Sequence, residues 1–302
     1  MPEGHSVHRL ARQLTDVFGG QRLSVSSPQG RFAAGAALLD GREFLTATAH
    51  GKQLFARFAG GRILRVHLGL YGAFSFGGDE TFRGASSIGA PRRIGEREMY
   101  DGGTPVPYTG PPEPVGQVRA RLVSAHGWAD LRGASACEVL SVPEAAAVRD
   151  RLGPDPLSPG APAAGRDDFV RRLGTTGTTI AAALMNQALV AGVGNIYRAE
   201  SLFRATLNPW TRGRDIRRDV LEGLWGDLCV LMADGVREGH IITTRPEHRA
   251  DPQAPVWPDH AYYTYQRHGL PCLVCGTPIG LTELAARKLY WCPGCQGPRP
   301  VT

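Results

Sequence analysis

Apolar residues near the start of the chain recur with the spacing of an amphipathic helix. They fall on one face of a helix with 3.6 residues per turn. We expect this helix to begin near Ser6, because a serine side chain can cap a first turn. The three residues after Met1 therefore lead directly into a helix N-terminus. The apolar series consists of Val7, Leu10, Leu14 and Val17.

Residues 21 to 76 carry the pattern of β structure. Apolar and polar residues alternate from 53 to 58, a Gly-Gly pair can form a tight turn, and the pattern returns from 62 to 68. Two such runs around a glycine turn predict a β-hairpin. Lys52 lies at the mouth of that hairpin, directly after a glycine.

The next segment, residues 77 to 115, is rich in Gly, Pro and Arg and has no period. We expect it to be a mobile insertion. The strand pattern resumes from 117 to 124 and from 128 to 131. We therefore expect a first domain over residues 1–141.

The pattern then becomes helical, and proline-rich stretches interrupt it. Helices are predicted at about 144–152, 166–174, 178–189, 195–205 and 215–237. We expect this helical domain to cover residues 142–260. A cysteine-bearing module follows over residues 261–302, so the fold class is α+β with several domains.

The charge of the chain favours an anionic partner. Lys and Arg number 34 against 28 Asp and Glu, which gives a formal net charge of +6 and a pI of about 9.2. Nucleic acid is the commonest partner of such proteins. Only Lys52 and Lys288 are lysines, so each is a candidate for a task that an always-charged arginine cannot perform.

We expect no contact with membranes. The first residues lack an apolar core, so we expect no signal peptide. The most apolar stretch, residues 180 to 194, is too short to cross a bilayer and is interrupted by two amides. A cytoplasmic location, in association with the bacterial nucleoid, is the expectation.

Four cysteines near the C-terminus have the spacing of a zinc site. Cys272 and Cys275 form one Cys-x2-Cys pair, and Cys292 and Cys295 form another after sixteen residues. Four thiolates complete a tetrahedron, so the single Zn²⁺ would be structural. The alternative is four free or disulfide-bonded cysteines. The hairpin expected between the pairs carries basic and aromatic side chains, which suggest contact with DNA or RNA, although such a ribbon could equally serve protein contact.

The second residue is a candidate nucleophile. If Met1 is removed, the amine of Pro2 has a pKa of about 8, against about 10.4 for a lysine. A secondary amine that attacks a sugar carbon gives an iminium ion. Glu3 can act as acid or base close to the same atom, and Lys52 could supply a proton. Taken singly, each of these residues is more often a surface or capping residue.

Together these residues resemble the formamidopyrimidine-DNA glycosylase and endonuclease VIII family. The resemblance covers nearly the whole chain except the insertion. It is carried by Met-Pro-Glu-Gly with Lys52, by 153–157 with 191–198, and by 287–296. It implies an N-terminal β-sandwich with flanking helices, a helix–two-turn–helix domain and a C-terminal zinc ribbon.

The resemblance also implies roles for matching residues. Pro2 would form the Schiff base, Glu3 would donate a proton, and Lys52 would assist base loss and β-elimination. Arg287 would hold a phosphate and assist δ-elimination. Asn195 would bind phosphate from the turn before a helix; its alternative role is helix capping.

Members of the family flip the damaged nucleotide out of the helix and fill the gap with wedge side chains. Leu70 and Tyr71 fit that role here. Gly69 departs from the pattern, so contact with the opposite base would come from elsewhere, and Arg132 is a candidate. Lys288 is expected to contact DNA next to Arg287 in the zinc ribbon.

These observations predict a monomeric enzyme that acts on damaged double-stranded DNA. It would be a bifunctional glycosylase and abasic-site lyase that removes oxidised bases. We expect it to prefer oxidised pyrimidines over 8-oxoguanine. One alternative is an abasic-site lyase with little glycosylase activity, motivated by Gly69. Another is a non-catalytic DNA-binding protein, because fold alone does not guarantee chemistry.

Overall fold

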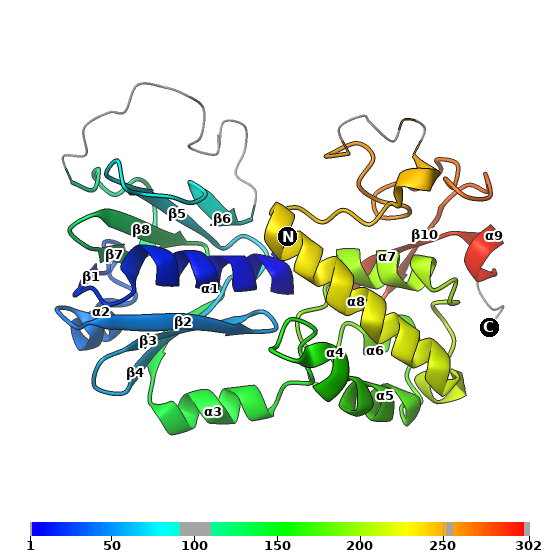
Figure 1. Cartoon of the computed structure of the whole chain (residues 1–302), viewed down its shortest axis with the longest axis horizontal. Helices are drawn as coiled ribbons and strands as arrows, with labels where there is room; N and C mark the ends of the chain where they lie inside the picture. The colour runs from blue at the N-terminus through cyan, green and yellow to red at the C-terminus, as the bar shows by residue number, and fades with distance from the viewer. Residues whose placement is uncertain (1, 91–109, 250, 252–255, 299–302) are drawn as a thin grey trace. The chain divides into compact units, whose positions relative to one another are not determined.

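The computed structural model describes residues 2–90, 110–249, 251 and 256–298 (Figure 1). The chain forms two compact units, Met1–Asp150 and Arg151–Thr302. Part of the expected insertion, residues 91–109, lies outside the described residues. Among the described residues, no helix is both long and apolar enough to span a membrane.

Within its described residues, the first unit contains two antiparallel sheets and three helices. One sheet has the strand order β2-β3-β4-β9, and the other has the order β1-β7-β8-β5-β6. The strands of the first sheet are β2 (Phe44–His50), β3 (Gln53–Phe58), β4 (Arg62–His67) and β9 (Ala136–Leu140). Those of the second are β1 (Ser24–Ser26), β7 (Val118–Val123), β8 (Gly127–Arg132), β5 (Ala73–Gly78) and β6 (Ser87–Gly89). The helices are α1 (Gly4–Phe18), α2 (Ala33–Leu39) and α3 (Val142–Asp150).

The two sheets share one hydrophobic core. Leu54 and Val66 of the first sheet belong to the same buried cluster as Phe74 and Leu122 of the second. Helix α1 contributes its predicted apolar face to this cluster, including Leu10, which is fully buried. The expected arrangement of a β-sandwich with flanking helices is confirmed.

Several local expectations were wrong. Helix α1 begins at Gly4 with Glu3 at the N-cap position, not at Ser6. Helix α2 interrupts the region expected to be all β, because its Ala- and Leu-rich sequence has high helix propensity. Strand β6 lies within the expected insertion and pairs with β5. The first unit also extends beyond the expected boundary at residue 141 and ends at Asp150, because α3 packs on Phe55 of this unit.

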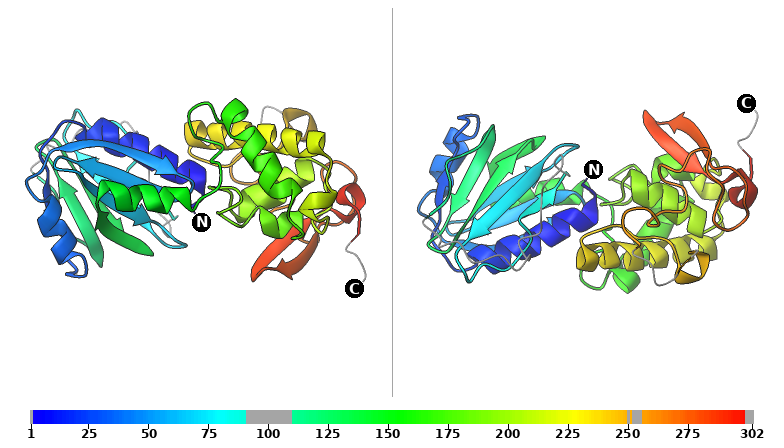
Figure 2. Two further views of the ribbon diagram at one scale, coloured as in Figure 1. Left: turned by 90° about the horizontal axis from the view of Figure 1, so that it is seen from below. Right: turned by 90° about the horizontal axis from the view of Figure 1, so that it is seen from above.

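The second unit combines helices with a two-stranded ribbon (Figure 2). The helix expected over 178–189 is only one turn, and two further turns follow it. The zinc ribbon packs within this unit. The helices are α4 (Ala161–Ala164), α5 (Arg166–Gly174), α6 (Ile180–Ala183), α7 (Asn195–Arg204), α8 (Arg218–Glu238) and α9 (Pro293–Gln296), with short 3-10 turns at Gly213–Asp215 and Pro246–His248. The ribbon consists of β10 (Gly280–Leu284) and β11 (Arg287–Trp291).

A buried carboxylate ties the segment before the ribbon to α7. Glu200 is fully buried and accepts hydrogen bonds from the backbone N–H groups of Tyr263, Thr264 and Tyr265 at 2.7 to 2.8 Å. The hydroxyl of Thr264 donates to the same carboxylate at 2.9 Å, and that of Thr243 donates to it at 2.5 Å. Five donors converge on one carboxylate, which offsets the cost of burying its charge.

We expect Glu200→Gln to lower the free energy of unfolding of the protein by about 3 kcal/mol, because an amide NH₂ would then face backbone N–H groups. Urea denaturation measures the change. Glu222→Gln is the matched control, since that half-buried carboxylate pairs with the exposed Arg218 on α8. Equal midpoints for the two variants would contradict the role given to Glu200.

Candidate functional site

The N-terminal segment places Pro2 and the carboxylate of Glu3 at the start of α1. Pro2 and Glu3 are both buried, and Glu3 has an extended backbone at the N-cap position. The carbonyl oxygen of Glu3 accepts the N–H of Ser6 at 3.1 Å. A helix N-terminus carries partial positive charge, which disfavours a protonated amine nearby.

Lys52 lies at the same end of the first unit. Helix α1 packs against β2, and Thr15 Oγ1 accepts the N–H of Ala47 at 2.8 Å. From Ala47 to His50, the last residue of β2, the strand advances by about 10 Å, which equals the rise of about seven helical residues. Counted back along α1 from Thr15, this distance reaches His8, and Lys52 lies beyond His50 in the two-residue turn to β3, toward the start of α1. Figure 1 shows the end of β2 beside the start of α1.

A histidine that sequence reasoning missed stands beside Lys52. His67, the last residue of β4, pairs with Gln53 across the hairpin. Burial lowers the pKa of His67, and the charges of Lys52 and Arg65 lower it further. The imidazole is therefore neutral at pH 7. The signal was available in the sequence, because the predicted hairpin register places the two residues at the same end.

The turn between β4 and β5 presents two apolar side chains to solvent. Leu70 is 40% exposed and Tyr71 is 80% exposed. Gly69 has a φ of +68°, and a Cβ there would lie 3.0 Å from both Cβ and Oγ of Ser135. A side chain at residue 69 would therefore crowd Ser135, which explains the glycine. Leu70 and Tyr71 are exposed, as expected of wedge side chains.

Arg132 is bound within the first unit. Its guanidinium donates to the carbonyl oxygen of Val115 at 2.8 Å, to Ser75 Oγ at 3.1 Å and to Asp130 Oδ2 at 3.1 Å. Asp130 also forms a bidentate pair with the buried side chain of Arg121. A contact between Arg132 and a DNA base stays a prediction.

In the second unit, the two turns before α7 are held by a glutamine. Gln187 donates from Nε2 to the carbonyl oxygen of Val193 at 3.0 Å and accepts the N–H of Gly192 at 3.0 Å. The carbonyl oxygen of Gln187 accepts the N–H of Gly153 at 2.8 Å. A Cβ on Gly153 would lie 2.5 Å from the carbonyl group of Leu189, so the 153–157 motif packs directly on these turns.

Asn195 begins α7 and binds the ribbon. Its side-chain Nδ2 donates to the carbonyl oxygen of Lys288 at 2.9 Å. Arg198 is fully buried and donates to the same carbonyl oxygen at 2.9 Å and to Asn195 Oδ1. The structure therefore brings Asn195 next to the backbone of β11, where the side chains of Arg287 and Lys288 are exposed.

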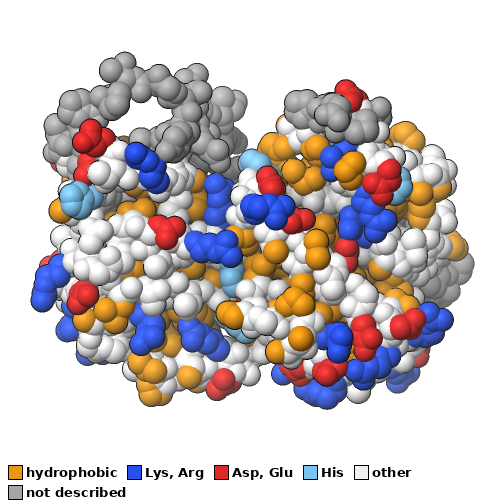
Figure 3. Space-filling view, viewed as in Figure 1, with side chains coloured by type: hydrophobic (Ala, Val, Ile, Leu, Met, Phe, Trp, Pro, Cys, Tyr) orange, Lys and Arg blue, Asp and Glu red, His pale blue; other side chains and the backbone are white. Residues whose placement is uncertain are grey.

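The arginines on α5 and on the start of α8 are paired with acids. Arg171 and Arg172 bind Asp168, while Arg218 binds both Asp167 and Glu222. In Figure 3 this part of the second unit shows basic and acidic side chains mixed together. Exposed pairs of this kind contribute little to stability. This surface is thus of mixed charge.

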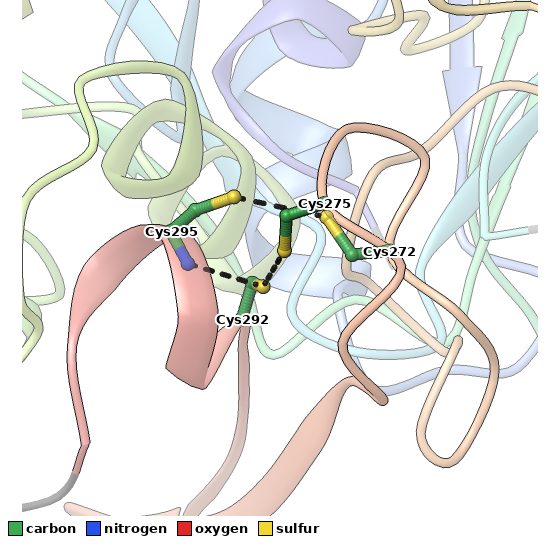
Figure 4. A group of neighbouring side chains, drawn as sticks. All are labelled: Cys272, Cys275, Cys292 and Cys295. Carbon is green, nitrogen blue, oxygen red and sulfur yellow. Dashed lines mark hydrogen bonds between the residues drawn. The ribbon is translucent and has the colours of Figure 1, made fainter.

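The four predicted ligands converge at the base of the ribbon. The sulfur atoms of Cys272, Cys275, Cys292 and Cys295 all lie within 4.8 Å of one another (Figure 4). Two loops that are distant in the sequence thus supply one donor set of four thiols, which suits tetrahedral Zn²⁺. Hydrogen bonds from Thr277 lower the pKa of Cys275 to about 6, which favours one thiolate in advance. A zinc ion held by these four thiolates would support the ribbon that carries Arg287 and Lys288, and its role would be structural.

Comparison with family models covers most of the chain. Residues 1–105 match the formamidopyrimidine-DNA glycosylase N-terminal domain. Residues 152–246 match the formamidopyrimidine-DNA glycosylase H2TH domain. Residues 269–297 match a zinc finger found in FPG and IleRS. The expected helix–two-turn–helix domain and zinc ribbon are confirmed.

Individual relatives align over nearly their whole lengths. A Mycobacterium tuberculosis protein named Endonuclease 8 1 is 43% identical over 298 residues, which cover 98% of this chain and 100% of the relative. A Thermus thermophilus formamidopyrimidine-DNA glycosylase is 30% identical, with 99% of this chain and 100% of the relative covered.

Solved structures show the same fold. The crystal structure of the MutM (Fpg) protein from Thermus thermophilus has a TM-score of 0.71 and 28% identity, and it covers 99% of this chain and 100% of that one. A Lactococcus lactis Fpg mutant in complex with a Fapy-dG-containing DNA has a TM-score of 0.72 at 20% identity, over 98% of this chain and 99% of that one. At that identity the second likeness concerns the fold alone.

Proposed function

Because the chain belongs to the formamidopyrimidine-DNA glycosylase and endonuclease VIII family of DNA repair glycosylases, we propose that it excises oxidised bases from double-stranded DNA and cuts the strand at the resulting abasic site. The observation that carries this proposal is the placement of Pro2, Glu3 and Lys52 at one end of the first unit. An amine, a carboxylate and a lysine together supply a nucleophile and two proton-transfer groups.

The first step replaces the bond from C1′ to the base by a bond to Pro2 and then breaks the bond from C1′ to the ring oxygen. Once Met1 is removed, the nitrogen of Pro2 attacks C1′ of the damaged nucleotide, and the bond from C1′ to the base breaks. Glu3 supplies a proton as the sugar ring opens. The product is an iminium ion between Pro2 and C1′, with the base released.

The second step cuts the strand. The iminium acidifies the C2′ proton, and its removal expels the 3′ phosphate by β-elimination. A further elimination expels the 5′ phosphate, and water hydrolyses the iminium to return free Pro2. We assign proton transfer to Lys52 and phosphate binding to Asn195, Arg287 and Lys288, because a helix N-terminus and exposed cations both attract phosphate.

The proposal is tested by reduction with borohydride. Untagged protein is mixed with duplex DNA that carries one abasic site, and the mixture is reduced. We expect a covalent protein–DNA band whose cross-linked residue is Pro2 on peptide mapping. Zinc-loaded, folded protein that binds this DNA but gives no band would contradict the Schiff-base mechanism.

We propose that oxidised pyrimidines are the preferred bases. The identity to Endonuclease 8 1 is higher than that to formamidopyrimidine-DNA glycosylase, and the Leu70–Tyr71 pair supports the same choice. Matched duplexes with an oxidised pyrimidine, 8-oxoguanine or an abasic site distinguish the substrates. Cleavage of the abasic duplex alone would instead support a lyase with little glycosylase activity.

DNA binding should weaken steeply with salt. Each phosphate contact releases counterions, so the logarithm of the binding constant falls linearly with the logarithm of salt concentration. We expect Arg287→Ala to reduce that slope by about 1. Fluorescence anisotropy at several salt concentrations measures it, with Arg171→Ala as the control, because Arg171 is paired with Asp168. An unchanged slope for Arg287→Ala would remove this residue from the phosphate contacts.

A further inference from the structure

A small cavity in the second unit is lined by residues that the proposed reaction does not use. Phe203 and Tyr263 stack with their ring centroids 4.6 Å apart, and both line a cavity of about 130 Å³ together with Val274. Arg245 and Val274 are exposed, so the cavity opens to solvent on their side. An apolar cavity of about 150 Å³ holds one benzene ring. This cavity therefore has the size of one aromatic side chain.

A cation that the protein itself does not pair stands at the opening of the cavity. Arg245 contacts Tyr263 through its backbone N–H, which donates to the tyrosine hydroxyl at 2.9 Å, so the guanidinium is not used in that bond. Arg204 also lines the cavity, but Asp227 pairs with it. Arg245 is thus the cation that can pair with an anion on a molecule in the cavity.

The surroundings of the cavity carry more positive than negative charge. Arg249 donates to the carbonyl oxygen of Thr244, and Arg267 donates to that of Tyr263 at 2.7 Å, so neither charge is cancelled by these partners. The acidic residue on the same turn as Arg245 is Glu247, which is exposed. Three arginines against one carboxylate favour an acidic ligand.

Apolar side chains adjoin the cavity on the loop that carries the first cysteine pair. Leu273 and Val274 lie between Cys272 and Cys275, and both side chains are exposed. Leu270, two residues before this pair, is exposed as well. Exposed apolar residues that gather beside a cavity indicate contact with another molecule. A peptide, which can cover this loop and enter the cavity together, suits the surface better than a lone small molecule.

The cavity lies at the opposite end of the ribbon from Arg287. Cys295 of α9 lines the cavity. Strand β11 runs from Arg287 to Trp291, and Cys292 follows directly, so about 17 Å of extended chain separate Arg287 from the cysteine end. Figure 2 shows the ribbon extending away from α9. A molecule in the cavity would therefore leave Arg287 and Lys288 free to contact phosphate.

We propose that this cavity binds the aromatic side chain at the carboxyl end of an acidic protein segment, with the terminal carboxylate on Arg245. The ring would fill the cavity against Phe203 and Tyr263, and the preceding residues would lie on Leu273 and Val274. The terminal carboxylate is the anion closest to an aromatic side chain at a chain end, which suits a cation at the opening of a cavity that holds one ring. A partner protein bound in this way could accompany the enzyme on DNA.

The ligand chemistry is tested with a synthetic peptide. A fluorescently labelled peptide of aspartates and glycines that ends in phenylalanine is titrated with the full-length, zinc-loaded protein, and anisotropy measures binding. We expect saturable binding that weakens about tenfold or more when the last residue is alanine, because the buried ring is lost. A carboxyl-terminal amide should weaken it about fivefold. N-acetylphenylalanine should compete only at far higher concentration. Equal competition would replace the peptide by a free aromatic acid, and absence of peptide binding would overturn the proposal.

Variants then locate the site. Arg245→Ala should weaken the peptide with a free carboxylate about fivefold and leave the amidated peptide unaffected. Its matched control is Arg237→Ala, an exposed arginine that pairs with Asp234. Val274→Glu should repel the acidic peptide, whereas Val230→Glu on the exposed face of α8 should not. Each variant should keep its zinc and its rate of abasic-site cleavage.

Two outcomes of these measurements would overturn the proposal. Equal losses for the free and amidated peptides in Arg245→Ala would remove the carboxylate contact. Displacement of the peptide by an abasic-site duplex, or slower DNA cleavage by Arg245→Ala, would show that the cavity belongs to the DNA-binding surface. Simultaneous binding of peptide and duplex is the expected result.

Discussion

A protein that retains an uncleaved peptide in front of Pro2 is expected to lose base excision and strand cleavage by about a thousandfold or more, because loss of a nucleophile commonly costs at least that much. An amide nitrogen has no available lone pair for attack at C1′. Pro2 is also buried at the start of α1, so additional residues would have to pass through that site. Cleavage of an oxidised-pyrimidine duplex under single-turnover conditions measures the loss.

Two controls separate blocked chemistry from a damaged fold. The same peptide placed at the C-terminus should leave the rate unchanged. Proteolytic removal of the N-terminal peptide, so that Pro2 is again the first residue, should restore the rate. Full activity of the blocked protein would rule out Pro2 as the nucleophile and would move attention to Lys52, the lysine at the same end of the first unit.

The elements with a strong period were predictable from the sequence. The apolar face of α1 and the β3–β4 hairpin follow from their hydrophobic spacing alone. Helix α2 was missed because it is short and its helical propensity was hidden inside a region of strand pattern. The short α6 was predicted too long, because Asn186 and Gln187 bond to backbone groups and turn the chain.

The candidate site was predictable only where its residues are close in sequence or carry a motif. The cysteine pairs and the Pro2–Glu3 start were identified in that way. The hairpin register already placed His67 beside Lys52, but its contacts with Ser135 and Gly69 could not be predicted, because only the fold brings these residues together. Likewise, the side chain of Asn195 donates to the backbone carbonyl of Lys288. A contact with the backbone cannot be predicted from a pattern of side chains in the sequence.

Removal of zinc is expected to abolish DNA cleavage while the first unit stays folded. Metal binding contributes about 10 kcal/mol or more to the folding of small zinc modules. Without it, β11 would lose the support that holds the carbonyl of Lys288 against Asn195 and Arg198. We therefore expect Cys292→Ser to lose bound zinc and to lower the cleavage rate by about a hundredfold or more, in line with the effect of displacing substrate-positioning groups. Zinc content and single-turnover cleavage measure the two effects.

Lowering the pH should also remove the zinc, because protons compete with zinc for the cysteine sulfur atoms. Burial raises the pKa of Cys292 to about 11, so zinc binding must displace its proton. Protons compete more strongly as the pH falls, and zinc affinity should therefore decrease steadily toward acid. Cys137→Ser is the control, because this half-buried cysteine on β9 lies outside the metal cluster and should change neither zinc content nor rate. If Cys292→Ser lost its zinc and still cleaved DNA at the normal rate, the phosphate-binding role of the ribbon would be wrong, and Arg287 and Lys288 would have no part in the reaction.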